Sequence, residues 1–80
     1  MKYNISIFNE FMAAMQKAES LPDADLQMKI QPTILAVEKD EHYSARQKLK
    51  IYALLSDLSN CSEKERAKYI KKTAAALRKG

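Results

Sequence analysis

The chain has 80 residues, of which 46% are hydrophobic and 30% charged, and its formal net charge is +4. This length supports one hydrophobic core and excludes two, so a single helical domain over residues 1–80 is expected. The composition is that of an ordinary globular domain and excludes an intrinsically disordered chain.

Backbone-breaking residues are scarce. The only glycine is Gly80, and the only prolines are Pro22 and Pro32. Tight β-hairpins need Asn-Gly, Asp-Gly or Gly-X turns, and phosphate-binding loops need several glycines. The sequence therefore predicts an all-α bundle of four amphipathic helices, or five if the second helix is split at Pro32.

The first helix is predicted over residues 5–19, with Asn4 as its N-cap. Its apolar side chains fall on one half of the circumference at about 100° per residue. They include two phenylalanines and two methionines: Phe8, Phe11, Met12 and Met15. In most helical bundles such a face is core, but a wide face of this kind also suits a binding groove, a homodimer interface or membrane insertion.

The second helix is predicted over residues 22–38. Ser20 is a suitable N-cap, Pro22 is tolerated in the first turn, and Asp23 suits the positive end of the helix dipole. Pro32 should interrupt the backbone hydrogen bonds. However, the apolar stripe stays in phase across Pro32, which favours one kinked helix over two separate helices.

The third helix is predicted over residues 43–58, after the polar link 39–42. In its second half, apolar residues cover nearly every direction, which is typical of a helix at the centre of a domain. We therefore expect the other helices to pack around it. These residues are Leu49, Ile51, Tyr52, Ala53, Leu54, Leu55 and Leu58.

The fourth helix is predicted over residues 63–78, where Ser62 and Glu65 match the Ser-x-x-Glu capping box. Residues 61–80 hold seven Lys or Arg against two acids, whereas residues 1–60 hold seven against eight. The positive charge therefore belongs to the last helix. On its outer face the cations form a basic stripe on an arc of about 120°: Lys64, Lys68, Lys71, Lys72, Arg78 and Lys79.

The basic stripe is compatible with a solvated helix face, because lysines near a helix C-terminus complement the dipole and keep a small domain in solution. It also suits an acidic protein, an anionic membrane surface or a nucleic-acid backbone. The stripe is nearly all lysine, so it would contact phosphates and not base edges. Any nucleic-acid binding should therefore be non-specific.

About eighty residues in four or five amphipathic helices is similar to the saposin-type architecture, and this resemblance implies lipid binding. The family has six cysteines, whereas Cys61 is the only cysteine of this chain. No residue roles are carried over from the family.

A single cysteine excludes an internal disulfide and favours a reducing compartment. No secretory signal pattern or apolar run long enough to span a bilayer is present, so a cytoplasmic location is expected. His42 is the only histidine, and with Asp40 and Glu41 it lies on a link where consecutive side chains do not converge on a metal. Cys61 precedes a helix start that would stabilise a thiolate, but it has no evident base.

No catalytic constellation, metal spacing or cofactor loop emerges, so we expect no enzyme activity, no metal and no cofactor. The leading hypothesis is a small protein-interaction module, acting as an adaptor, inhibitor or regulator through a helical face. Its partner would be a protein. The basic stripe would suit an acidic one, and a homodimer is compatible with the same surface. Binding to anionic membranes and non-specific binding to nucleic acid remain the alternatives.

Overall fold

The computed structural model describes residues 4–79 and contains four α-helices and two short 3₁₀ helices. None of the described residues lies in a β-strand, so the predicted all-α fold is confirmed. The elements in chain order are α1 (Ile5–Ala14), η1 (Ala18–Ser20), α2 (Asp23–Lys39), α3 (Ala45–Asn60), η2 (Glu63–Glu65) and α4 (Arg66–Arg78).

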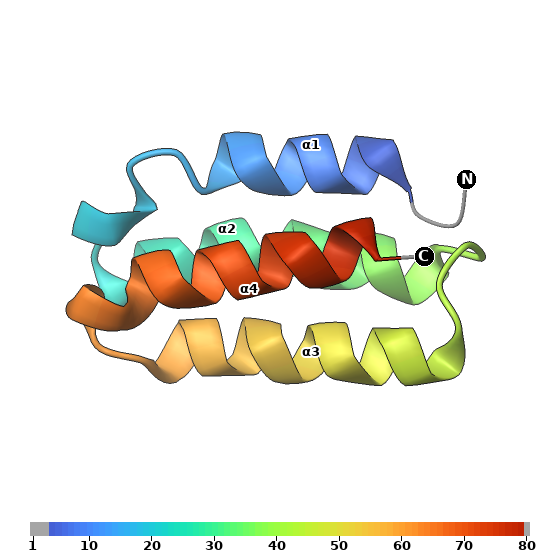
Figure 1. The fold of residues 1–80 in the computed structure, drawn as a ribbon. Helices are drawn as coiled ribbons and strands as arrows, with labels where there is room; N and C mark the ends of the chain where they lie inside the picture. The colour runs from blue at the N-terminus through green and yellow to red at the C-terminus, as the bar shows by residue number, and fades with distance from the viewer. Residues whose placement is uncertain (1–3, 80) are drawn as a thin grey trace.

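Successive helices run in opposite directions (Figure 1), and each helix packs against two others, so that the four form a closed ring. Helix α4 packs between α1 and α3, and α2 packs between the same two helices on the other side. The bundle is elongated, with extents of 33 × 19 × 17 Å. The connections between successive helices are short, and short connections place successive helices side by side and antiparallel.

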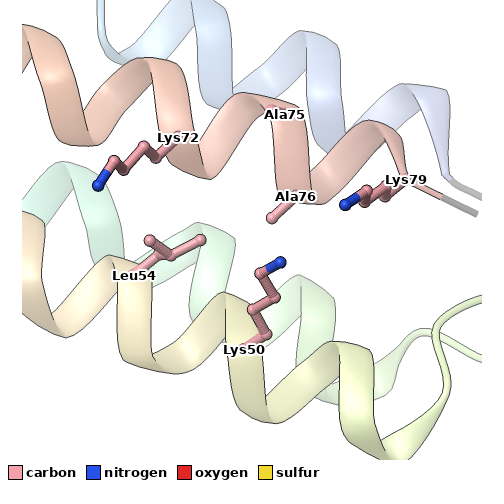
Figure 2. A pocket seen from close by; sticks show the side chains of 6 residues that line it. All are labelled: Lys50, Leu54, Lys72, Ala75, Ala76 and Lys79. Carbon is pink, nitrogen blue, oxygen red and sulfur yellow. The ribbon is translucent and has the colours of Figure 1, made fainter.

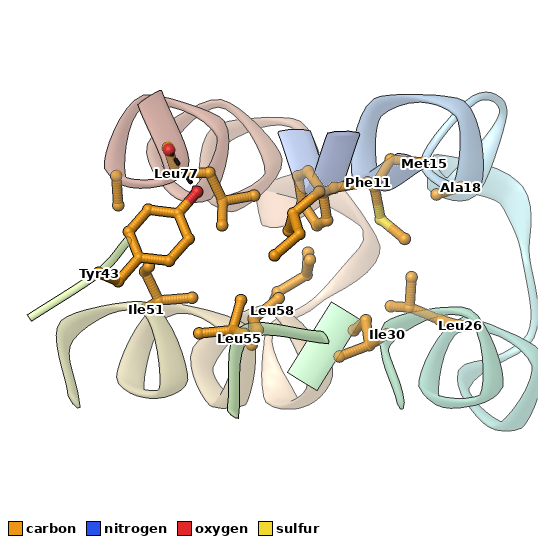
Figure 3. Close-up of a cluster of buried hydrophobic side chains, with 13 residues drawn as sticks. Phe11, Met15, Ala18, Leu26, Ile30, Tyr43, Ile51, Leu55, Leu58 and Leu77 are labelled. Atoms are coloured by element: carbon orange, nitrogen blue, oxygen red, sulfur yellow. Dashed lines mark hydrogen bonds between the residues drawn. The ribbon is translucent and has the colours of Figure 1, made fainter. Parts of the chain in front are cut away.

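The core runs along the bundle axis and takes side chains from all four helices and from the links between them (Figure 3). Removing such side chains from water is the main favourable term in folding, at about 1.5–3 kcal/mol for each large one. The buried apolar residues are Ile7, Phe11, Met15, Ala18, Leu26, Ile30, Val37, Tyr43, Ile51, Leu55, Leu58, Ala76 and Leu77.

The prediction that α3 is central and buried all round is wrong. Only Ile51, Leu55 and Leu58 of this helix are fully buried, whereas Leu49 is 69% exposed. In a closed ring every helix has one inner face and one outer face, and the apolar residues of α3 beyond its inner stripe reach its sides or the solvent.

Helix α1 ends at Ala14, five residues before the predicted end. Lys17 adopts a left-handed conformation with φ of 60°, and η1 follows directly. Ser20 does not cap α2, because its hydroxyl donates to the Lys17 carbonyl at 3.2 Å. The prediction failed here because no glycine marks the left-handed position, which glycine adopts more readily than lysine.

Helix α2 continues through Pro32, which confirms one helix over two. Proline has no N–H to donate to the Met28 carbonyl one turn earlier. Met28 and Pro32 are both exposed, so water can reach this carbonyl. The hydrogen bond that is missing at Pro32 therefore lies on the exposed side of the helix, and it does not end the helix.

A capping box is present in the structure, but not at Ser62 and Glu65, where it was predicted. The capping box forms at Ser44 and Gln47, at the start of α3. Ser62 makes no side-chain cap bond, and the segment after it forms η2 before α4 begins at Arg66. Asn4 caps α1 as predicted, accepting from the backbone N–H groups of Ser6 and Ile7.

One end of the bundle is closed by Asp40. Its carboxylate accepts from the Asn4 side chain at 2.9 Å and from the backbone N–H groups of His42 and Tyr43 at 2.7 and 3.0 Å. The Tyr43 hydroxyl donates to the Leu77 carbonyl of α4 at 2.7 Å. These bonds join the start of α1, the link 40–44 and the end of α4.

The other end is closed by Arg66, which is only 1% exposed. Its Nη1 donates to the carbonyls of Ala18 at 3.1 Å and Leu21 at 2.6 Å, with a longer bond of 3.4 Å to Glu19. Its Nη2 donates to the Asp23 carboxylate at 2.6 Å. The guanidinium therefore attaches α4 to the junction between α1 and α2.

Lys17→Gly should stabilise the fold. A left-handed conformation costs a non-glycine residue about 1–2 kcal/mol, and part of this is recovered with glycine after its larger unfolded-state entropy is allowed for. We expect the free energy of unfolding to rise by up to about 1 kcal/mol in urea titrations. Lys17→Ala is the control and should give no such gain. Equal stability of the two variants would contradict the conclusion that Lys17 adopts a left-handed conformation that costs free energy.

Asp40 should make stability depend on acid. Burial raises the pKa of Asp40, but the hydrogen bonds from Asn4, His42 and Tyr43 outweigh it, and the folded-state pKa lies below the ordinary 3.8. Because the pKa of Asp40 is lower in the folded state, the ionised carboxylate stabilises the fold fully when the pH is above the unfolded-state pKa. This stabilisation is lost as the pH falls through the folded-state pKa.

Urea unfolding of the wild type and of Asp40→Asn, followed from neutral pH down through the acid range, tests this dependence. The variant should be less stable at neutral pH and should lose less stability on acidification. Parallel pH profiles of the two proteins would contradict the role of Asp40.

Candidate binding grooves on the fourth helix

All six residues of the predicted basic stripe are exposed. Within residues 4–79, the ion pairs are His42 with Asp40 and Arg66 with Asp23, so the stripe takes part in none of them. The packing of α4 between two helices divides the stripe. Lys71 and Arg78 line a groove beside α1, whereas Lys72 and Lys79 line a hollow beside α3.

The α1–α4 groove has a volume of about 440 Å³ and an apolar floor. It unites part of the predicted apolar face with part of the basic stripe, because α1 and α4 pack side by side. Phe8 is half-buried and Met12 is 39% exposed. The lining residues are Phe8, Met12, Met15, Glu19, Ala67, Ile70, Lys71, Ala74, Ala75 and Arg78.

The predicted apolar face therefore has two roles. Phe11 is fully buried and belongs to the core, so it is not available to a ligand. Met15 is only 5% exposed, but its side chain still reaches the groove wall. The accessible part of the face is Phe8 and Met12.

The cations of the α1–α4 groove lie over its apolar wall. The Arg78 guanidinium carbon lies 5.5 Å from the centre of the Phe8 ring, which is cation–π geometry. Lys71 is seven residues before Arg78 on the same face of α4, and Glu19 is the single carboxylate of the lining. The groove thus combines an apolar floor with a net positive charge.

The α3–α4 hollow is a second concave region, of about 390 Å³ (Figure 2). Lys72 and Lys79 reach it from α4, and Lys50 reaches it from α3. An adjoining depression of about 300 Å³ shares Lys50 and Lys79 and adds Arg46. The other lining residues of the two depressions are Gln47, Leu54, Ala75 and Ala76.

Sequence reasoning missed Arg46 and Lys50. Their four-residue spacing places them on one side of a helix, but periodicity does not reveal which helix packs beside that side. The bond from the Gln47 side chain to the Lys79 carbonyl, at 2.8 Å, brings the end of α4 against the start of α3. This packing converts two separate cation pairs into one basic surface.

Tyr69 of α4 is half-buried. The amines of Lys68 and Lys72 lie 5.6 and 5.5 Å from the centre of its ring. Lysine side chains thus cover the ring, and the attraction between cation and ring restrains them.

The remaining residues considered from the sequence have local partners. His42 lies on an exposed link, as predicted, and its Nδ1 is 3.1 Å from the Asp40 carboxylate. The Cys61 thiol donates to the Leu58 carbonyl at 3.4 Å. Burial, and then the charge of Glu65, raise the pKa of this thiol, so the stabilised thiolate considered from the sequence is not favoured.

Comparison with known protein families, with curated proteins and with solved structures gave no match. Function is therefore inferred from the geometry of the α1–α4 groove and the α3–α4 hollow. In the described part of the chain, no helix is both long and apolar enough to cross a bilayer. Nor do His, Cys, Asp and Glu side chains of that part gather in threes where they could hold a metal ion.

Proposed function

We propose that the chain is a small, non-enzymatic protein-interaction module. Its α1–α4 groove would bind an acidic amphipathic helix of a partner protein. The observation that carries this proposal is one concave surface that is lined by the half-buried Phe8 and the exposed Met12 of α1 and by two cations of α4. By binding such a partner, the module would act as an adaptor, inhibitor or regulator.

A helix is the partner element that fits this shape. A groove between two antiparallel helices that pack side by side accepts the apolar face of a third helix, with anchors spaced one turn apart. Phe8 and Met12 lie about one turn apart on α1, and the buried Met15 follows at the C-cap of the helix. Methionine adapts its shape to different apolar partners, which suits an interaction surface.

The charge of the groove selects an acidic partner. Lys71 and Arg78 outnumber Glu19 in the lining, so Asp or Glu flanking the apolar anchors of the ligand would gain attraction and association rate. A second copy of this chain is a weaker fit, because its own exposed face on α4 is basic. An anionic membrane surface offers the same charge but does not complement a concave groove.

Isothermal titration calorimetry with synthetic helical peptides tests the proposal. One peptide has Leu and Phe at helical anchor positions and Glu at the flanks, a second has Lys in place of Glu, and a third has Ser in place of the anchors. We expect binding of the first peptide only. Met12→Gln and Lys71→Glu should each weaken it about tenfold or more, equivalent to about 1.4 kcal/mol.

Lys29→Glu is the matched control, because Lys29 is an exposed lysine on α2 outside the groove. It should bind the acidic peptide as the wild type does. Absence of binding to the acidic peptide, equal binding of the basic peptide, or indifference to both groove variants would overturn the proposal. Binding to acidic vesicles that exceeds binding to the peptide would favour the membrane alternative.

A further inference from the structure

The α3–α4 face is a second candidate binding surface, separate from the groove of the proposed function. We propose that it binds the phosphate backbone of duplex DNA without sequence preference. Four cations from two helices surround its two adjoining depressions: Arg46, Lys50, Lys72 and Lys79. The inference does not depend on the α1–α4 groove.

The positive charge of this face is not neutralised locally. Neither depression is lined by Asp or Glu, and all four cations are exposed. Asp57, three residues after Leu54 on α3, lies outside both linings. None of the four cations belongs to an ion pair within residues 4–79. Their charges are therefore available to an external anion.

The packing of the two helices fixes the backbone positions that carry these cations. The Tyr43 hydroxyl and the Gln47 side chain donate to carbonyls of Leu77 and Lys79, which anchors the end of α4 to the start of α3. Figure 2 shows Lys50 of α3 reaching toward the gap between Lys72 and Lys79. Because the surface is organised before binding, less entropy is lost when it meets a rigid ligand.

The spacing along the helices suits an extended polyanion better than a single small anion. Lys72 and Lys79 are seven residues apart, or about 10 Å along α4, and Arg46 and Lys50 are about 6 Å apart along α3. Lys64 and Lys68 extend the row of cations toward the other end of the bundle. Duplex DNA presents a phosphate about every 3.4 Å on each strand, so it can meet such a row in many registers.

Other ligand classes fit this face less well. Membrane insertion uses exposed apolar side chains, but the exposed large ones of the described residues (Ile5, Met12, Met28, Leu35 and Leu49) line neither depression. The same lack of anchors disfavours a protein partner. Single strands need aromatic rings for base stacking, but lysines cover the ring of Tyr69.

The test is fluorescence anisotropy of a labelled duplex of mixed sequence, titrated with the full chain at several salt concentrations. Binding should weaken steeply with salt, because each neutralised phosphate contributes a slope of about −0.9 in log K against log salt. Lys50→Gln/Lys72→Gln should bind more weakly and lower the slope by about two contacts. A second duplex of unrelated sequence should bind equally.

Lys29→Gln/Lys39→Gln is the matched control, because it removes the same charge from exposed positions on α2. It should keep the wild-type slope. No duplex binding, equal slopes for the two double variants, or tighter binding of a single strand than of the duplex would overturn the inference. The inference would also be overturned if the chain bound acidic vesicles more tightly than it binds the duplex, and if Lys50→Gln/Lys72→Gln no longer bound those vesicles.

These outcomes are distinct from those for the α1–α4 groove. Met12→Gln, which should weaken binding of the acidic peptide, should leave the affinity for the duplex unchanged. Loss of duplex binding in Met12→Gln would show that both ligands share one surface, and this would overturn the separation of the two sites.

Discussion

The arrangement of this bundle depends on the buried guanidinium of Arg66. The segment between α1 and α2 contains a left-handed residue and a single 3₁₀ turn, so several of its carbonyls lie outside a regular α-helix, although that of Ala18 accepts from the Leu21 N–H. Arg66 supplies donors to three of them and to the Asp23 carboxylate. Without Arg66 the carbonyls of Glu19 and Leu21 would lose their donor in a partly buried place, and a fully buried polar group left unpaired costs about 1–3 kcal/mol, which is large beside the stability of a small domain.

Helix α4 is consequently held at both ends. Arg66 anchors its start, and the bonds from Tyr43 and Gln47 anchor its end. Between these anchors the helix lies in the valley between α1 and α3, with Ala75 shared by the depressions on its two sides. The cations of the basic stripe are thereby divided between the α1–α4 groove and the α3–α4 hollow. The two sides of α4 can therefore bind two different kinds of ligand, an acidic helix and a polyanion.

Apolar periodicity was enough to predict four helices, the continuity of α2 through Pro32 and the exposure of the basic stripe. It could not predict the burial of Arg66, because an arginine within a lysine-rich segment normally lies in solvent. Apolar periodicity also led to the wrong prediction that α3 is central. The sequence does not show whether apolar residues on the sides of a helix contact neighbouring helices or solvent. Leu49 is the clearest example.

The two grooves illustrate the same restriction. Phe8, Met12, Lys71 and Arg78 were each recognised from the sequence, but on separate helices. Only the packing of α1 against α4 brings them together. Arg46 and Lys50 carried no signal of their own, because their significance comes from the neighbouring end of α4. Tertiary contacts, and not local patterns, create both candidate sites.

The most direct test of this account is urea unfolding of Arg66→Met beside Arg46→Met. The first variant removes a buried arginine with four acceptors, and the second removes an exposed arginine that is in no ion pair of the described residues. The account predicts a loss of about 2 kcal/mol or more for Arg66→Met and within about 0.5 kcal/mol for Arg46→Met. Equal stability of the two variants would contradict it.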